Sequence, residues 1–216
     1  MAKIWQDIDE FLQLVRLGVD NAQAVPEIVD AIAAYGIDAA RMTEGAGLLA
    51  TAESLQSAQV KAYGAQHGAT DALNAAFADA DKLFATHRKL AKMVFREDGD
   101  AQTALHLTER KKQAFDPWMG QATTFYENLT GDPAWVTAMG RFNVTALMLT
   151  DAQAGLAALK SLDSAQEKAK GAAQGATKTR NAALDALDLW YGEFRNVARI
   201  ALDGSQALET LGIKAG

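Results

Sequence analysis

Apolar positions recur every three or four residues near the start of the chain, as on the buried face of a helix. Five of them follow this spacing: Ile4, Ile8, Phe11, Leu12 and Val15. The pattern predicts a first helix over residues 3–18, which we expect Asp20 and Asn21 to end. Pro26 then suits the first turn of a short helix that Gly36 closes.

Two much longer stretches, residues 38–95 and 145–202, contain no proline and keep a helical pattern of apolar positions. The sequence predicts a long helix over each of them. The segments between and after them predict short helices, over 116–131, from Pro133 to Arg141, and just beyond each long stretch. No stretch alternates between apolar and polar residues as a half-buried strand does, so the predicted fold class is all-α.

The middle of the first long stretch is written twice. Residues 55–76, LQSAQVKAYGAQHGATDALNAA, return 107 positions later as LDSAQEKAKGAAQGATKTRNAA, and 14 of the 22 aligned residues are identical. A repeat of about half the chain length predicts two copies of one helical unit. We therefore expect a single all-α domain made of two pseudo-equivalent repeats, 1–107 and 108–216.

The repeated stretches leave two architectures open. Each long stretch is one continuous helix, or it bends near Gly64–Gly68 and Gly171–Gly175 to form a compact up-down four-helix bundle. The continuous helix is favoured because the glycine segments contain no Pro, Asp-Gly or Asn-Gly. In the first long stretch a seven-residue register also passes through the glycines without a slip: Met42, Leu49, Gln56, Tyr63, Thr70, Phe77, Phe84 and Ala91.

Two continuous helices would lie antiparallel, with short helices making a bundle at each end. Their middles are rich in Ala and Gly, whereas the aromatic residues gather towards the two ends. We interpret the G-x-x-x-G spacings, Gly64/Gly68 and Gly171/Gly175, as the place where the two helices cross closely. The middles are also compatible with a coiled-coil contact.

This crossing also predicts a register. If Gly64 and Gly68 face Gly171 and Gly175, the numbers of facing residues add to about 239. The hypothesis is that two ion pairs of opposite charge then fix the alignment: Arg88 with Asp151, and Glu44 with Arg195.

Charge and composition narrow the function classes. The chain has 27 acidic and 21 basic residues, spread along its length, for a formal net charge of −6. Because nothing concentrates positive charge, we expect no nucleic-acid partner. No stretch of 18 uncharged apolar residues exists, so we expect no membrane insertion. The N-terminal residues do not resemble a signal peptide, and the expected location is the cytoplasm, with export by a leaderless route as the alternative.

Candidate reactive groups are few. The chain has no cysteine and no Glu-x-x-His pair, and its three histidines are far apart in sequence, so we expect no metal. No Ser or Lys stands in the context of a nucleophile, and no glycine-rich loop resembles a phosphate site, so we expect no cofactor and no enzyme. One aromatic cluster is a candidate pocket or partner surface: Trp118, Phe125, Tyr126 and Trp135.

The end of the chain carries a family resemblance. The sequence RIAL at residues 199–202, the turn Asp203-Gly204 and the ending Leu211-Gly212-Ile213 follow a long Ala- and Gln-rich helix. This layout resembles an uncharacterised bacterial family of tandem-repeat helical bundles, and the resemblance covers most of the chain. No activity is known for that family, so the resemblance implies the fold and no functional residues.

The sequence thus predicts a non-enzymatic structural or protein-interaction protein that associates with itself or with another protein. The alternative is a small-molecule binding or sensory module with an apolar pocket in one lobe. A cavity of several hundred cubic ångströms would favour the second class, and exposed apolar residues at the ends would favour the first.

Overall fold

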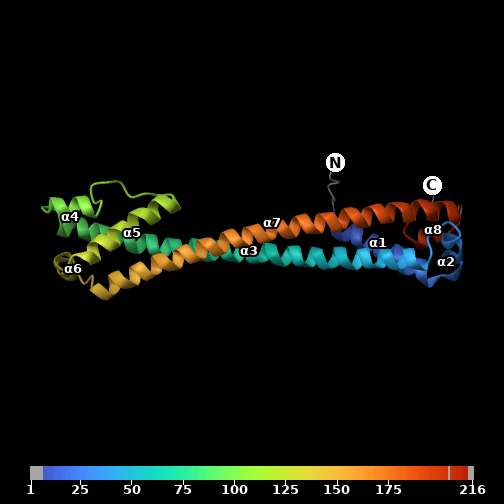
Figure 1. The fold of residues 1–216 in the computed structure, drawn as a ribbon, viewed down its shortest axis with the longest axis horizontal. Coiled ribbons are helices and arrows are strands. Elements are labelled where there is room, and N and C mark those ends of the chain that lie inside the picture. The colour runs from blue at the N-terminus through green and yellow to red at the C-terminus, as the bar shows by residue number, and fades with distance from the viewer. Residues whose placement is uncertain (1–6, 204, 214–216) are drawn as a thin grey trace. The chain divides into compact units, whose positions relative to one another are not determined.

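The fold consists of α-helices joined by short connections (Figure 1). The computed structural model describes residues 7–203 and 205–213, and within them there is no strand. The helices are α1 (Ile8–Ala24), α2 (Pro26–Ala33), α3 (Ala39–Val94), α4 (Gly99–Ala104), α5 (Phe115–Gly131), α6 (Pro133–Gly140), α7 (Ala146–Ala201) and α8 (Ala207–Thr210).

The two long helices, α3 and α7, are each unbroken over 56 residues and pack antiparallel against each other. The prediction of continuous helices is confirmed, and the alternative of helices broken at the glycines is wrong. Each long helix starts at a residue that caps it. The Asp38 carboxylate accepts a hydrogen bond from the Arg41 backbone N–H at 2.9 Å, and the Thr145 hydroxyl accepts one from Met148 N–H at 3.3 Å.

The first helix differs from its predicted bounds. The Asp7 carboxylate accepts the Glu10 backbone N–H at 3.0 Å, so α1 begins at Ile8; residues 3–6 lie outside the described part. The helix continues through Asn21, whose side-chain amide donates to the carbonyl oxygen of Thr210 at 2.6 Å. Because the Asn21 amide donates to Thr210, it does not compete with the helical hydrogen bonds of its own backbone. The helix ends at Ala24, because Pro26 disfavours helical geometry at the residue before it.

The chain forms two compact units, and their boundary is not the boundary between the sequence halves. Unit 1 contains residues 1–64 and 171–216, and unit 2 contains residues 65–170. Each unit therefore combines part of the first sequence half with part of the second. Long-range helix pairing decides this division, because each half of α3 packs against a segment of α7 from the other copy.

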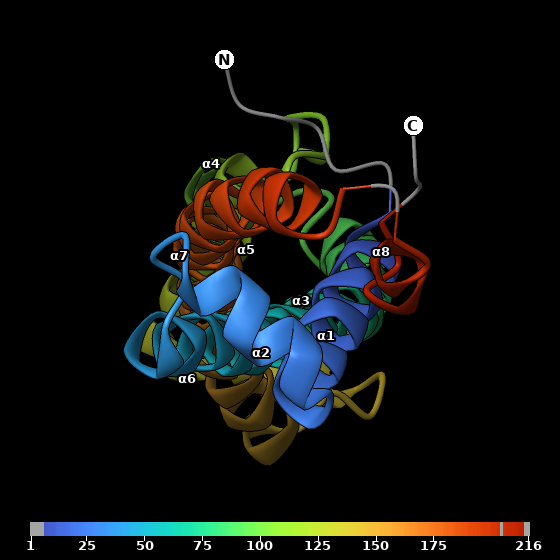
Figure 2. The same cartoon turned by 90° about the vertical axis from the view of Figure 1, so that its right-hand side faces the viewer.

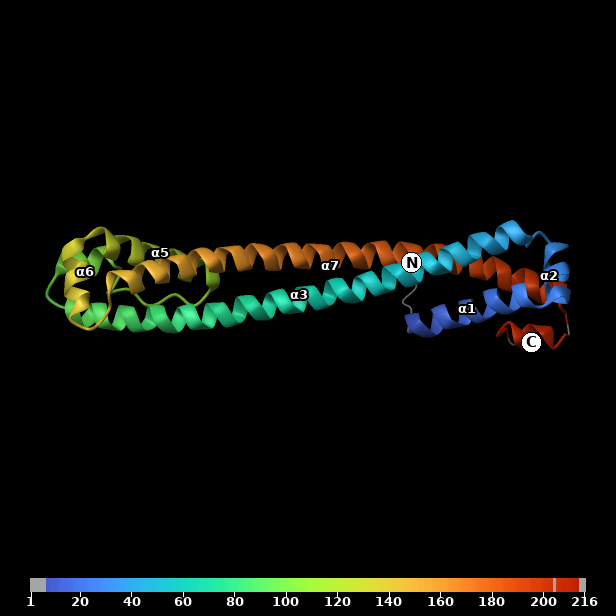
Figure 3. The same cartoon turned by 90° about the horizontal axis from the view of Figure 1, so that it is seen from below.

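In unit 1, α1 lies beside the first part of α3 and the last part of α7 (Figure 3), and α2 crosses the end of this group (Figure 2). The core contains three aromatic side chains of α7. Trp190 and Tyr191 both stack on Phe194, with ring centroids 5.4 and 5.9 Å apart. Gly18 lets α1 approach these rings: a Cβ there would lie 3.3 Å from Tyr191 Cε2.

In unit 2, α5 supplies the side chains that fill the core between the last part of α3 and the first part of α7. Phe84 from α3 packs edge-on against Trp118 and Phe125, with centroid distances of 5.7 and 5.4 Å. Phe125 lies 107 residues after Gly18. In unit 2 the ring of Phe125, on α5, therefore fills the space at this position. In unit 1 the corresponding residue is a glycine, and larger rings of α7 fill the space instead, so the two cores reach dense packing with different side chains.

We call residues 107 positions apart counterparts; beyond α8 the offset is 106. The positive-φ residues of the described chain form two such pairs: Gly36 (φ 91°) with Asn143 (φ 60°), and His106 (φ 52°) with Gly212 (φ 71°). After each comes a buried apolar residue whose N–H bonds five residues back, as Ile213 does to Leu208 O at 3.0 Å. This is the Schellman arrangement that ends a helix. The Leu-Gly-Ile ending is thus a structural cap.

Candidate functional site

The four glycines of the repeated stretch do not mark a close helix crossing. Gly64, Gly68, Gly171 and Gly175 are all exposed, and no described atom outside their own surroundings lies within 4 Å of a Cβ built on any of them. The buried position of α7 in this region is Ala173, which is 2% exposed. Residues two positions apart point to opposite sides of a helix, so Gly171 and Gly175 face outward. The predicted crossing at these glycines is wrong.

A close approach does exist at Gly45, near the start of α3. A Cβ at Gly45 would lie 2.0 Å from Cζ2 of Trp190, so the indole ring rests on the bare backbone of α3. The Trp190 N–H donates to the carbonyl oxygen of Arg41 at 3.2 Å. In unit 2 the counterparts of Gly45 and Trp190 are Ala152 and Leu83. In unit 1 the absence of a side chain at Gly45 makes room for the large ring of Trp190. In unit 2 the larger Ala152 goes together with the smaller Leu83, so a gain in volume at one position is matched by a loss at the other.

Neither of the predicted register pairs forms. Glu44 pairs with Arg41 on its own helix, at 2.6 Å, and Arg195 lies over the ring of Tyr191, 5.1 Å from its centroid. Arg88 binds backbone carbonyls, and Asp151 has no ion-pair partner among the described residues. The prediction that these pairs set the register is therefore wrong.

The observed register differs from the predicted one by about one helical turn. Arg41 forms an ion pair with Glu193, and Arg180 donates to Gln56 Oε1 at 3.3 Å. These numbers add to 234 and 236, whereas the sequence hypothesis required about 239. Burying apolar side chains contributes more than exposed ion pairs do, so the Gly45–Trp190 contact and its neighbours determine the alignment.

The aromatic cluster of unit 2 is core and not a surface. Trp118, Phe125 and Tyr126 are 0 to 1% exposed, and Trp135 is partly buried against Phe95 with ring centroids 5.9 Å apart. Trp118 and Phe125 therefore belong to the core, and the prediction of a partner surface is wrong for them. Tyr126 forms part of the wall of a groove between α3 and α7, and for the partly exposed Trp135 the prediction stays a prediction.

Arg88 is a buried cation, 7% exposed, that sequence reasoning assigned to an ion pair. Its Nη2 donates to the carbonyl oxygens of His106, at 2.8 Å, and Glu109. Burial lowers the pKa of the guanidinium, with the Glu109 carboxylate opposing the shift. The side chain holds the segment after α4 against α3, which is a structural role. The sequence feature that points to this role is the segment Leu105-His106-Leu107, because it corresponds in the repeat to the Leu-Gly-Ile cap.

The same connecting segment is held by Asp81. Its carboxylate accepts hydrogen bonds from the ammonium group of Lys111 and from the indole N–H of Trp118, the latter at 2.6 Å. Gln121 completes the arrangement, with its Oε1 accepting the Lys112 backbone N–H at 3.0 Å. The carboxylate is saturated by partners that order the loop, so it is unsuited to acid–base catalysis.

His87 and Tyr126 form a buried polar pair that unit 1 lacks. Nδ1 of His87 and the Tyr126 hydroxyl oxygen share a hydrogen bond of 3.0 Å, and the two side chains are 2% and 1% exposed. Burial lowers the pKa of His87 and raises the pKa of Tyr126, because it disfavours the charged form of each. Their counterparts in unit 1 are Phe194 and Val19, an apolar pair.

The buried histidine predicts a loss of stability in mild acid. The folded pKa of His87 lies below its ordinary value of 6.5. As the pH falls below about 6.5, the unfolded chain binds a proton that the folded chain does not, so the free energy of unfolding falls. We expect His87→Gln to make this decrease between pH 7.5 and pH 5 smaller, because glutamine does not titrate. Urea unfolding at several pH values measures it. A decrease as large in His87→Gln as in the wild-type protein would contradict the assignment.

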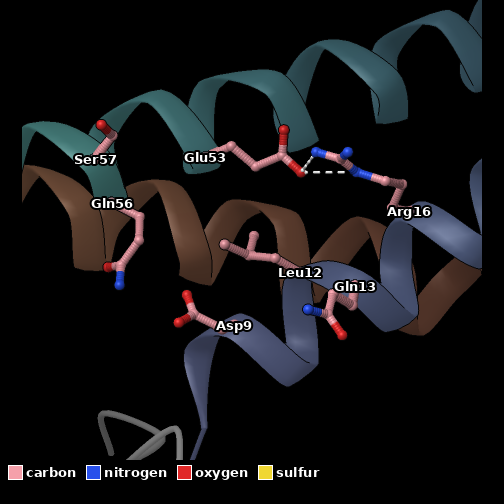
Figure 4. A pocket seen from close by; sticks show the side chains of 7 residues that line it. All are labelled: Asp9, Leu12, Gln13, Arg16, Glu53, Gln56 and Ser57. Carbon is pink, nitrogen blue, oxygen red and sulfur yellow. Dashed lines mark hydrogen bonds and ion pairs between the residues drawn. The ribbon is translucent and has the colours of Figure 1, made fainter.

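A surface groove of about 450 Å³ lies between α1 and α3 in unit 1 (Figure 4). Its floor is Leu12, and its sides are polar. An ion pair between Arg16 and Glu53 spans it, and this hydrogen bond raises the pKa of Arg16. Asp9 and Gln56 flank the same space (Figure 4). Arg16 and Glu53 pair with each other, and Asp9 adds one further carboxylate to the lining.

Large apolar side chains are exposed at counterpart positions in both copies. Tyr35 and Phe142, in the turns after α2 and α6, are 58% and 42% exposed. Met93 and Ile200, at the ends of α3 and α7, are 59% and 62% exposed. The sequence placed Tyr35 and Phe142 among the aromatic residues that gather towards the two ends. Aligning the two copies of the repeat singles out these positions, because both copies have a large apolar residue at each of them.

In each unit the two elements that carry these residues end on the same side. The end of α2 and the end of α7 lie together in unit 1, and the end of α6 and the end of α3 lie together in unit 2 (Figures 1 and 3). We call Tyr35 with Ile200 the unit 1 apolar surface, and Phe142 with Met93 the unit 2 apolar surface. Each of these two surfaces consists of one aromatic and one aliphatic exposed side chain.

Comparison with known proteins adds no assignment. No protein-family model, curated protein or solved structure matches this chain. Within residues 7–203 and 205–213, no three His, Cys, Asp or Glu side chains gather to hold a metal ion. None of the helices in this part of the chain is long and apolar enough to cross a membrane. Function therefore has to be inferred from the surfaces themselves.

Proposed function

We propose that this protein is a non-enzymatic interaction protein that associates with itself through the unit 1 and unit 2 apolar surfaces. The observation that carries the proposal is the pairing of exposed apolar residues, Tyr35 with Phe142 and Met93 with Ile200, at counterpart positions. Exposed aromatic and long aliphatic side chains are typical anchors of protein interfaces.

Other exposed apolar residues behave differently when the two copies are compared. Leu189, Val60 and Tyr63 are 69%, 57% and 48% exposed. Their counterparts are charged: Lys82, Glu167 and Lys170. A single exposed apolar residue is ordinary and needs no partner. A large apolar side chain that is exposed in both copies, as at Tyr35 with Phe142 and Met93 with Ile200, supports a shared contact role for those positions.

The buried polar groups support a role without chemistry. Asp81, Arg88 and His87 all bind partners that order unit 2. Since each unit carries one apolar surface, every chain offers two similar sites. A molecule with two such sites forms assemblies that grow beyond the dimer unless the geometry closes a ring.

Sedimentation velocity at protein concentrations from about 1 to about 500 µM tests the proposal. Dissociation constants in this range correspond to association free energies of about −8 to −4.5 kcal/mol. We expect the average mass of the wild-type protein to rise past that of a dimer. The variant Tyr35→Ser/Ile200→Gln, or Phe142→Ser/Met93→Gln, should stop at the dimer, and the combination of all four changes should be monomeric.

The matched control is Leu189→Gln/Val60→Gln, which removes two equally exposed apolar residues that have charged counterparts. This control should assemble like the wild-type protein. A wild-type protein that stays monomeric throughout, or a control that loses assembly to the same degree, overturns the proposal.

A further inference from the structure

All three histidines of the chain lie among the residues that form unit 2. They are His67, His87 and His106, whereas unit 1, which contains residues 1–64 and 171–216, has none. Histidine is the side chain whose ordinary pKa lies between pH 5 and pH 8. Mild acid therefore offers protons to the imidazoles of unit 2 and to no imidazole of unit 1.

Of the three, His87 is the histidine inside a core. It is 2% exposed, and its Nδ1 shares the hydrogen bond of 3.0 Å with the hydroxyl oxygen of Tyr126. The two rings meet edge-on, with centroids 5.8 Å apart, and this contact joins the middle of α5 to the last part of α3. In contrast, His67 is exposed and His106 pairs at the surface with Glu109. A proton added to His87 alone would be a charge buried in the core.

No carboxylate in residues 7–203 and 205–213 bonds to the His87 ring. The charged residues of the surrounding elements are engaged elsewhere or lie in solvent. On α3, the neighbouring Arg88 binds the carbonyl oxygens of the segment after α4. On α5, Glu127 is exposed, and on α7, Asp151 is exposed beside the groove between α3 and α7. Burial is accordingly the cause that lowers the pKa of His87, and Tyr126 is the titratable group that faces it.

Unit 1 builds the same position from apolar side chains. The counterparts of His87 and Tyr126 are Phe194 and Val19, which are 0% and 2% exposed. The contact that joins α1 to α7 therefore does not respond to pH, whereas the corresponding contact in unit 2 contains a group that titrates.

We propose that unit 2 is the acid-sensitive part of this protein: protonation of His87 in mild acid frees α5 from the long helices, while unit 1 stays closed. Because α5 fills the core of unit 2, its release also frees the preceding segment, which Arg88 and Asp81 hold against α3. Proteins open in such cooperative parts at a lower free energy than global unfolding requires. The opening involves none of the residues of the two apolar surfaces, so it is independent of self-association.

The direction of the effect follows from proton binding. The pKa of His87 in the closed form lies below its ordinary value of 6.5. As the pH falls below about 6.5, the opened form takes up a proton that the closed form does not, so the population of the opened form rises. Uptake of a single proton limits this rise to about tenfold per pH unit.

Hydrogen exchange of the full chain, followed by mass spectrometry between pH 7.5 and pH 5, tests the proposal. Each measured rate is divided by the rate of an unstructured peptide at the same pH, which gives the protection of each segment. Below about pH 6.5 we expect the protection of α5, residues 115–131, to fall by up to about tenfold per pH unit. The protection of α1, residues 8–24, should change less than that of α5.

Two variants remove the titrating group. His87→Gln keeps a polar partner for Tyr126, and His87→Phe/Tyr126→Phe gives unit 2 an apolar pair like that of unit 1. In both, the protection of α5 should no longer fall with pH. The matched control is His106→Gly, which introduces the residue of the counterpart Gly212 at a position of positive φ and should keep the wild-type fall. Three results would overturn the proposal: protection of α5 that does not depend on pH, an equal fall in α1, or a fall in both His87 variants that matches the wild-type protein.

Discussion

Replacing Gly45 by alanine is expected to destabilise the protein by about 2–3 kcal/mol, although alanine favours the helix by about 1 kcal/mol over glycine. The new Cβ would lie 2.0 Å from Cζ2 of Trp190, well inside contact distance. The indole cannot retreat easily, because it stacks on Phe194 with ring centroids 5.4 Å apart and planes 9° from parallel. Urea unfolding followed by circular dichroism measures the loss.

Gly47→Ala is the matched control on the same helix. No described atom lies within 4 Å of a Cβ at Gly47, so this change should stabilise by about 0.5–1 kcal/mol through helix propensity alone. Equal stability of the Gly45→Ala and Gly47→Ala variants would contradict the contact with Trp190.

A second change should rescue the first. Trp190→Leu in the Gly45→Ala background reproduces the Leu83 and Ala152 pair of unit 2, in which the volumes match. We expect the double variant to lose less than the sum of the two single changes, with a coupling energy of about 1–2 kcal/mol. Strict additivity would mean that the two side chains do not share the space.

Replacing all four glycines of the repeated stretch by alanine should have the opposite effect. Gly64, Gly68, Gly171 and Gly175 are exposed, helical and without a described neighbour within 4 Å of a Cβ. Each change to alanine is expected to stabilise by about 0.5–1 kcal/mol, or about 2–4 kcal/mol for the four together. The gain comes from helix propensity and from the smaller entropy of the unfolded chain.

Thermal and urea unfolding of the fourfold variant checks this result. A close crossing at the glycines, as the sequence pattern suggested, would make the same variant less stable, because four methyl groups would force the helices apart. A fall in the free energy of unfolding would therefore contradict the structure at these positions. The single variant Gly18→Ala, whose Cβ would approach Tyr191 to 3.3 Å, is the comparison at a tight position.

Much of the fold could be predicted from the chain because helix formation is largely local. The absence of proline over 38–95 and 145–202, the caps at Asp38 and Thr145, and the seven-residue apolar register together specify two long helices. The end of α1 was missed because the tertiary partner of Asn21 is 189 residues away, where no local pattern can show it.

What the sequence by itself determined is therefore the helices, their repeat and the gathering of aromatic residues towards two cores. Only the tertiary structure decided which faces meet. A glycine in a helix looks the same in sequence whether it is crowded, like Gly45, or open, like Gly64; the difference depends on a side chain such as Trp190 that lies 145 residues further along. Register follows the fit of buried volumes across such distances, and a periodic pattern carries no information about that fit.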